Sequence, residues 1–206
     1  MSRFLYLVRH GEHEGNEFGV DDGPMSDRGR QQADRIAQRL RNVPLTHLWH
    51  SPLQRTEETA QRIMAGLGRD DSVASSLLMD CIPDGPEPDM PKGFESFYGG
   101  FTPEQWEAGS AQMADAFAEW MTPSGEDRHE LLVTHNFVIA WFTRHVLDAP
   151  AWRWLTISQV NCGLTVIRVR TIRPHVLIAH NDSGHLPPEL LTGFPTLSNL
   201  AAAPHR

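Results

Sequence analysis

The chain has 206 residues, of which 40% are hydrophobic and 21% are charged, and its formal net charge is −8. This length and composition suit one globular domain with a sizeable core and exclude a wholly disordered chain. The negative charge argues against a general nucleic-acid binder, which usually carries a basic footprint. No apolar run approaches the ~20 residues of a membrane span, and two cysteines are too few for a disulfide framework.

We therefore expect a single domain over residues 1–206, with no nucleic acid and no membrane among its partners. The first apolar run, Phe4–Val8, is too short for a signal peptide, so a reducing cytoplasm is the expected location. Assembly into a homo-oligomer is left open.

The first informative stretch is an apolar run that stops at Arg9, His10 and Gly11. A short apolar run ended by glycine is typical of a buried strand leaving a sheet. The carboxyl ends of such strands are where open α/β sheets bind ligands. The alternative is that Arg9 and His10 are ordinary loop residues beside an edge strand.

The following loop, residues 12–24, contains His13, Glu14 and Glu17, which could suggest a metal site. Its glycines argue against a helix, so no rigid ligand face forms and we expect no metal. Asn16 is either a phosphate hydrogen-bond donor or a turn residue.

A helix is expected from the cap residue Ser26 to about Arg41, with one narrow apolar stripe. Gly29 weakens its first turn without a local reason.

The second strand-to-helix switch lies at Ser51, which we expect to cap a helix whose first residue is Pro52. Arg55 then falls in the first turn, near the positive end of the helix dipole, where a cation is unfavourable. A bound anion would offset that penalty. The alternative is a surface arginine paired with Glu58 or Asp70.

Residues 72–79 indicate a weaker strand, and prolines then predict an irregular loop from Asp80 to Phe101. A loop of this length inside a compact domain is usually functional or disordered. Its aromatic residues favour an ordered flap, over about residues 80–102. A helix is expected from Thr102-Pro103 to about Met121.

The third switch is a strand that ends at His135, with Asn136 as a cap for a buried helix over residues 137–147. Later strands are expected over 157–170 and 176–179. Strands that alternate with helices imply a mainly parallel sheet, so the three strand ends share one edge.

Arg9, His10, Arg55 and His135 would therefore face one crevice beside helix N-termini, which suits a doubly charged phosphoryl group. Arginine stays protonated and cannot be a nucleophile, whereas a neutral imidazole can be one at pH 7. A plain anion-binding module would not need two histidines, so the pattern favours an enzyme.

The set of motifs resembles the histidine phosphatase superfamily, in its phosphoglycerate mutase-like branch. Four stretches carry the resemblance: Arg9-His10-Gly11-Glu12 with Asn16, Met25–Ala33, Ser51–Ala60 and Val133–Asn136. The resemblance implies a three-layer α/β/α sandwich with a mainly parallel central sheet.

By this resemblance His10 accepts the phosphate and becomes a phosphohistidine. Arg9, Arg55 and His135 hold the phosphoryl oxygens, with Asn16 and Asn136 as further phosphate-binding residues. No cofactor is implied.

The family also uses an acid, usually glutamate, just after the strand that ends near residue 79, and Asp80 stands there in this chain. Asp84 and Glu87 are the alternatives. The acid must protonate a leaving alkoxide and then deprotonate water, so its pKa should lie above the reference ~3.9 of aspartate.

The expected activity is hydrolysis of a phosphate ester, on a phosphorylated small molecule or a phosphoprotein, with selectivity set by the flap. The proline-rich stretch 80–88 is similar to that of a mitochondrial serine/threonine protein phosphatase subfamily. One alternative is a phosphoglycerate mutase-type phosphotransferase, although the flap offers only Lys92 as a further cation. Another, of a different class, is a catalytically weak phosphate-binding or scaffold protein.

Overall fold

The computed structural model describes residues 2–15 and 22–193, and within these ranges six strands form one twisted sheet. Its order is β3-β2-β4-β1-β5-β6. The strands are β1 (Arg3–Arg9), β2 (His47–His50), β3 (Ser72–Ala74), β4 (Arg128–Thr134), β5 (Leu164–Val169) and β6 (Val176–Asp182). The first four run parallel, and β5 pairs antiparallel with both β1 and β6. The expected mainly parallel sheet is confirmed.

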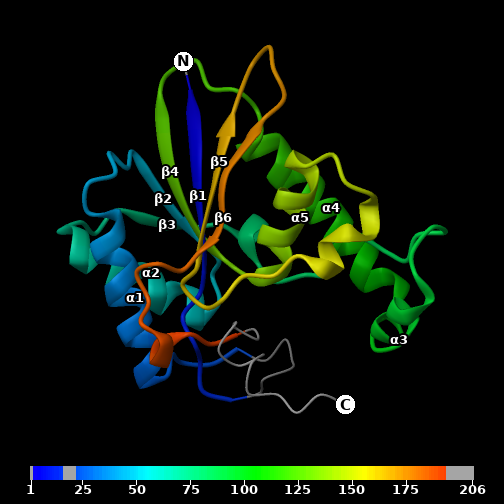
Figure 1. Ribbon diagram of the computed structural model, residues 1–206, viewed down its shortest axis with the longest axis horizontal. Coiled ribbons are helices and arrows are strands. Elements are labelled where there is room, and N and C mark those ends of the chain that lie inside the picture. The colour runs from blue at the N-terminus through cyan, green and yellow to red at the C-terminus, as the bar shows by residue number, and fades with distance from the viewer. Residues whose placement is uncertain (1, 16–21, 194–206) are drawn as a thin grey trace.

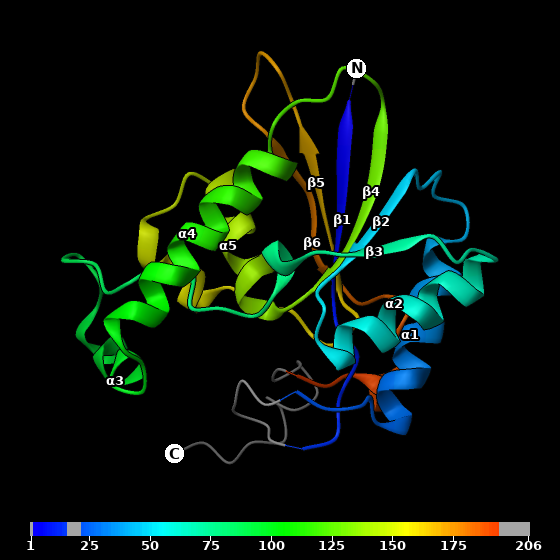
Figure 2. The same ribbon diagram turned by 180° about the vertical axis from the view of Figure 1, so that it is seen from behind.

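Helices cover both faces of this sheet, as Figures 1 and 2 show from opposite sides. On one face lie α1 (Asp27–Leu40) and α2 (Gln54–Leu67), and on the other lie α4 (Pro103–Trp120) and α5 (Asn136–Val146). β1 serves both cores because its side chains alternate: Leu7 packs with the α4–α5 side and Val8 with the α1–α2 side. The result is the expected three-layer α/β/α sandwich.

The predicted helix starts are confirmed for α1 and α4 but are wrong for α2 and α5. Ser26 caps α1 by accepting a hydrogen bond from Gly29 N, and Thr102 forms a capping box at α4. By contrast, α2 begins at Gln54 after the cap residue Leu53. Ser51 still belongs to the edge of the sheet, since its backbone N–H donates to Val133 O and continues the sheet ladder, and α2 begins three residues later.

Helix α5 is capped by His135, so Asn136 is its first residue and not its cap. The late strands are shorter or shifted compared with the sequence prediction, since residues 157–163 form a loop before β5 and β6 extends to Asp182. None of the helices in the described part of the chain has the length and apolarity that crossing a membrane requires.

The segment between β3 and α4 is more regular than its prolines suggest. The predicted strand over 72–79 ends at Ala74 and is followed by a short 3₁₀ helix. The flap contains another 3₁₀ turn, Lys92–Phe94, and the short helix α3 (Glu95–Tyr98). Phe97 packs edge-on against Trp154, with ring centroids 5.8 Å apart. The expected ordered flap is therefore present, although it is not a structureless loop.

Gly29, for which the sequence offered no reason, lies where α1 contacts the loop after β1. A Cβ atom on Gly29 would lie 2.0 Å from Glu12 O. Ser26 binds the same loop, since its N–H donates to Glu12 O and its hydroxyl to Glu12 Oε1. A side chain at position 29 would therefore push α1 away from the segment that carries His10.

We predict that Gly29→Ala lowers stability by about 1–3 kcal/mol, because the overpacking cost exceeds the usual gain of alanine in a helix. Chemical denaturation would measure the loss. The control is Gly125→Ala, since no atom lies within 4 Å of a Cβ built there. Equal stability of the Gly29 variant and wild type would contradict the assigned close contact.

Candidate active site

The carboxyl ends of β1, β2 and β4 meet at one edge of the sheet, where backbone hydrogen bonds continue beyond the strands. His10 N donates to Thr134 O at 2.9 Å, and Ser51 N donates to Val133 O at 3.0 Å. The rings of His10 and His135 consequently lie 5.2 Å apart between centroids. The expected convergence of the three switches on one site is present.

His10 is 5% exposed, and its Nδ1 lies 2.8 Å from Gly11 O. A carbonyl oxygen only accepts, so Nδ1 must carry the proton and Nε2 keeps its lone pair. Burial first, and then the imidazole of His135 and the two neighbouring arginines, lower the pKa of His10 well below its ordinary value. His10 is thus a neutral imidazole with an available Nε2 at pH 7.

His135 takes the opposite tautomer. Its Nδ1 lies 3.2 Å from an N–H of Arg55, which can only donate, so Nδ1 accepts. Its Nε2 then donates to Ser51 Oγ at 3.0 Å. Burial first, and then the positive charges of Arg55 and Arg9, lower the pKa of His135 well below the usual value. His135 therefore presents an N–H donor at Nε2 and is not a cation at neutral pH.

Arg55 is 1% exposed and lies at the start of α2, as expected. Its partners include two carboxylates, with NH1 at 3.3 Å from Asp22 Oδ1 and NH2 at 3.3 Å from Asp80 Oδ2. The alternative partners Glu58 and Asp70 are not its salt-bridge partners. Asp22 also accepts a hydrogen bond from Gln54 N at 2.7 Å, so a carboxylate already lies at this helix N-terminus.

Arg9 is held by the carboxyl-terminal part of the described chain. Its NH1 donates to Gln159 O at 2.8 Å and to Gly193 O at 3.1 Å. Burial lowers the pKa of Arg9 to about 10, with Asp80 opposing that shift, so the guanidinium stays charged at neutral pH. The carbonyl contacts fix the position of this cation without neutralising it.

Among the candidate acids, Asp80 is the one that the structure brings to the histidines. Its Oδ2 lies 3.8 Å from His135 Nδ1, and its side chain is 24% exposed. Burial raises the pKa of Asp80, while Arg55 and then Arg9 oppose the rise. The carboxyl group of Asp80 therefore stays protonated to a higher pH than that of a fully exposed aspartate.

The two alternative acids lie elsewhere. The carboxylate of Asp84 is hydrogen-bonded to α5, because Trp141 Nε1 donates to Asp84 Oδ2 at 2.8 Å. Its own pKa is raised by burial. Glu87 is half-buried in the flap.

The remaining expected residues have different outcomes. Asn16 lies outside the described residues. Asn136 accepts a hydrogen bond from Gln159 N at 2.8 Å, so its amide oxygen supports the loop before β5. Ser51 and Asp22 are site residues that the sequence interpretation missed. Ser51 belongs to a recognised motif but was assigned only a capping role, whereas nothing near Asp22 in the sequence indicates its contact with Arg55.

Within residues 2–15 and 22–193, no group of three histidine, cysteine, aspartate or glutamate side chains could hold a metal ion. What the site offers is a neutral imidazole with an unprotonated Nε2, two guanidinium groups, an imidazole N–H and the carboxyl groups of Asp22 and Asp80. This set can bind a tetrahedral dianion and attack it.

We predict opposite tautomers for the two site histidines. In a ¹H–¹⁵N spectrum, His10 should show a protonated Nδ1 and His135 a protonated Nε2. Both imidazoles should stay neutral from about pH 7.5 down to about 6, because their pKa values are depressed below the ~6.5 of an ordinary histidine. As pH falls through 6.5 the unfolded histidines gain protons that the folded ones reject, so stability should fall with acid. Imidazolium signals at neutral pH would contradict the assignment.

Comparison with known proteins gives a family match over most of the chain. The model of the histidine phosphatase superfamily (branch 1) matches residues 5–79 and 88–182. The mitochondrial serine/threonine-protein phosphatase Pgam5 of Caenorhabditis elegans is 33% identical over 201 residues, covering 93% of this chain and 66% of the relative. This chain thus spans about two thirds of the length of that relative.

Two further proteins are similar to this one. A probable phosphoglycerate mutase, GpmB of Salmonella choleraesuis, is 28% identical over 79% of this chain and 83% of its own length. The crystal structure of a phosphoserine phosphatase from Entamoeba histolytica has a TM-score of 0.70 at 23% identity, covering 90% of this chain and all of that one. At this identity the likeness shows a shared fold. With the family model matched over both halves of the sheet, the chain belongs to the histidine phosphatase superfamily, branch 1.

Proposed function

We propose that this protein is a phosphomonoesterase that hydrolyses a phosphate ester through a phosphohistidine on His10. The observation that carries the proposal is the buried imidazole whose Nδ1 proton is held by Gly11 O, which leaves Nε2 as the nucleophile. Named phosphatases among its relatives support the reaction class.

In the first step, Nε2 of His10 attacks phosphorus and the ester oxygen leaves with the electrons of the P–O bond. The two guanidinium groups and the Nε2–H of His135 stabilise the charge on the equatorial oxygens, where preorganised donors contribute most. Arg55, which donates to Nδ1 of His135, fixes the tautomer with a proton on Nε2, and Ser51 Oγ accepts that N–H at 3.0 Å.

Asp80 serves as the acid and base of the cycle. Its raised pKa favours a protonated carboxyl that gives its proton to the leaving alkoxide. The resulting carboxylate takes a proton from water, which attacks the phosphohistidine, so that inorganic phosphate leaves and His10 and Asp80 return to their starting states.

A mutase-type phosphotransferase is the second candidate, favoured by the similarity to a probable phosphoglycerate mutase. Such an enzyme usually needs further cations for the second acidic group of its substrate. Lys92 is exposed in the flap, and the flap around it is acidic. Phosphate release without added 2,3-bisphosphoglycerate would separate hydrolysis from cofactor-dependent transfer. No release at all would favour a phosphate-binding or scaffold protein.

The substrate is either a phosphorylated small molecule or a phosphoprotein. A cytoplasmic location is part of the proposal, whereas the Pgam5 relatives are named as mitochondrial.

We predict that His10→Asn lowers hydrolysis of p-nitrophenyl phosphate by about 10³-fold or more, because the nucleophile is lost. Wild type quenched during turnover should carry an acid-labile phosphate that the variant lacks. His47→Asn is the matched control, since His47 begins the same sheet's β2 at its far end. A variant that keeps its rate or its label would overturn the assignment of His10.

We also predict that Asp80→Asn cuts turnover by about 10²–10⁴-fold, because proton transfer is lost while the arginines remain. The rate of phosphoryl transfer to His10 should fall more for an alkyl phosphate than for p-nitrophenyl phosphate, because the p-nitrophenolate leaving group needs no proton. Inorganic phosphate should still inhibit at similar concentrations. The control is Asp84→Asn, and an equal or larger loss there would transfer the role to Asp84.

A further inference from the structure

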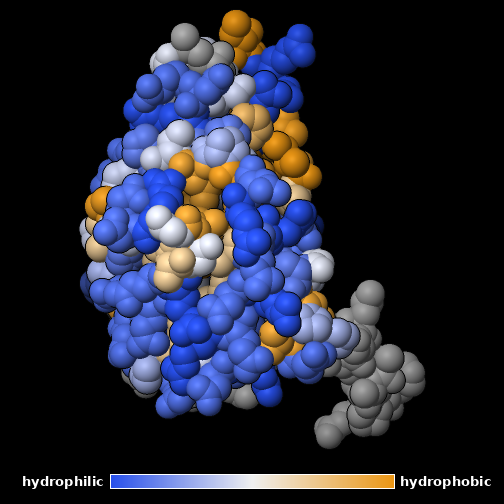
Figure 3. Space-filling view, turned by 90° about the vertical axis from the view of Figure 1, so that its left-hand side faces the viewer, coloured by the Kyte–Doolittle hydropathy of each residue, from blue (hydrophilic) through white to orange (hydrophobic). Residues whose placement is uncertain are grey.

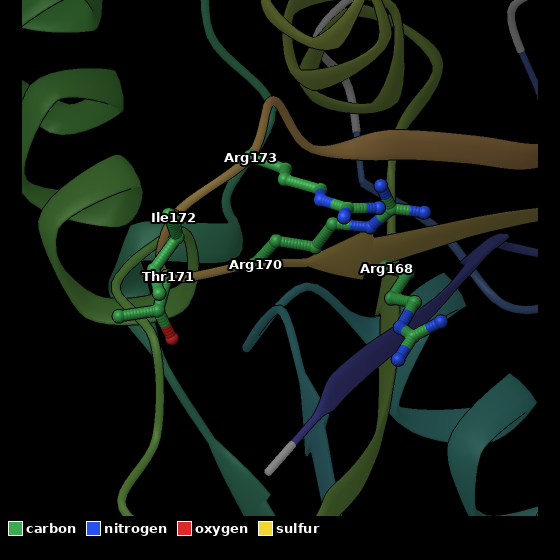
Figure 4. Close-up of a pocket in the computed structure, with 5 residues that line it drawn as sticks. All are labelled: Arg168, Arg170, Thr171, Ile172 and Arg173. Atoms are coloured by element: carbon green, nitrogen blue, oxygen red, sulfur yellow. The ribbon is translucent and has the colours of Figure 1, made fainter.

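A second cluster of cations lies on the β5–β6 hairpin, away from His10 and His135. A pocket of about 340 Å³ is lined by Arg168, Arg170, Thr171, Ile172 and Arg173. Figure 4 shows the side chains of Arg170 and Arg173 directed to the same side, with that of Arg168 on the same side of the hairpin. Three guanidinium groups thus border one small hollow.

No carboxylate of the described residues neutralises these three cations. In the part of the chain that the structure describes, none of them forms an ion pair with a carboxylate, although the chain carries a net charge of −8. Like charges that gather in this way repel one another, and an anion between them would relieve the repulsion. The arrangement indicates an anionic ligand.

Arg168 is built into the sheet and not simply exposed. Its guanidinium lies over the ring of Phe4, 5.5 Å from the centroid, and NH2 donates to Ser2 Oγ at 2.8 Å. Its Nε is buried without a hydrogen-bond partner in the protein. A buried donor of this kind is costly unless a ligand or water satisfies it.

The pocket is remote from the candidate active site. Arg168 pairs in register with Phe4, near the amino end of β1, whereas His10 follows the carboxyl end. Six residues of extended chain span about 20 Å. The pocket therefore does not form part of the phosphate site.

Its lining also offers apolar contact. Ile172 in the lining is 95% exposed, and Ile178, outside the lining on the neighbouring β6, is 54% exposed. β6 is an edge strand, and within the described residues no strand pairs with its outer side. Figure 3 shows apolar surface gathered in the upper half and along one side of an otherwise hydrophilic face.

We propose that the β5–β6 hairpin docks an acidic segment of a partner protein, with its carboxylate or phosphate groups between Arg168, Arg170 and Arg173 and an apolar side chain on Ile172. A free inorganic anion would use only the cations, whereas an extended segment uses the isoleucine and the strand edge as well. A membrane surface or a nucleic acid offers no extended polypeptide backbone for the edge of β6, so neither would use that feature of the hairpin. This docking does not rest on the proposed catalytic function.

The test is fluorescence anisotropy with a labelled peptide of alternating glutamate and valine, and with its glutamine–valine counterpart. The acidic peptide should bind, and more weakly as salt is raised, while the glutamine peptide should bind at least about tenfold more weakly. Arg170→Glu with Arg173→Glu should lower affinity by about tenfold or more. Hydrolysis of p-nitrophenyl phosphate should stay at the wild-type rate, which shows that this variant is folded.

The matched control is Arg35→Glu with Arg41→Glu, which makes the same charge change on exposed residues of α1 and its C-terminal cap. It should leave affinity within about twofold. Equal losses in the two double variants, equal binding of the glutamine peptide, or no saturable binding of the acidic peptide would each overturn the proposal. So would equal affinity for pyrophosphate, or capture by phosphatidylserine vesicles in place of the peptide.

Discussion

The parallel pairing of β4 with β1 on one side and β2 on the other is the constraint on which the site depends. Its register aligns Val8 with Val133 and Trp49 with Leu132, so three chain segments leave the sheet at the same level. Backbone hydrogen bonds then continue past the strand ends. The hydrogen-bond pairing of the strands therefore makes residues 10, 51 and 135 neighbours. Buried cores on both faces of the sheet hold that pairing in one register.

Burial of this edge decides its electrostatics. Two guanidinium groups and two imidazoles share a region from which water is largely excluded, so the imidazoles reject protons while the arginines retain them. Asp80 offsets part of the positive charge and is itself pushed towards the protonated form. The two guanidinium groups remain the cations that a phosphoryl dianion can bind, although Asp22 and Asp80 both pair with Arg55, and one imidazole lone pair carries no proton.

Apolar runs, caps and breakers at each strand-to-helix switch predicted the mainly parallel sheet and the convergence of the two histidines with Arg55, whereas the three layers were implied by the family resemblance. The sequence prediction failed where long-range pairing overrides such signals. The sequence pattern assigned Ser51 to a helix cap, but its backbone still pairs with β4. The prolines of the flap predicted an irregular loop where the short helix α3 forms. The contact of Asp22 with Arg55 joins residues 33 positions apart, and no local pattern encodes it.

Asp80, the proposed acid, is shorter than the glutamate usual in the family, and the backbone that precedes it accounts for its reach. Leu78 O accepts a hydrogen bond from Thr134 Oγ1 at 2.7 Å, and Met79 O accepts one from Gln112 Nε2 at 2.8 Å. The chain is therefore tied to β4 and to α4 directly before Asp80. Anchored there, aspartate reaches to 3.3 Å from Arg55 without the extra methylene of glutamate. The fixed main chain thus compensates for the shorter side chain of Asp80. The change from the usual glutamate to aspartate at this position therefore still leaves a carboxyl group in the site.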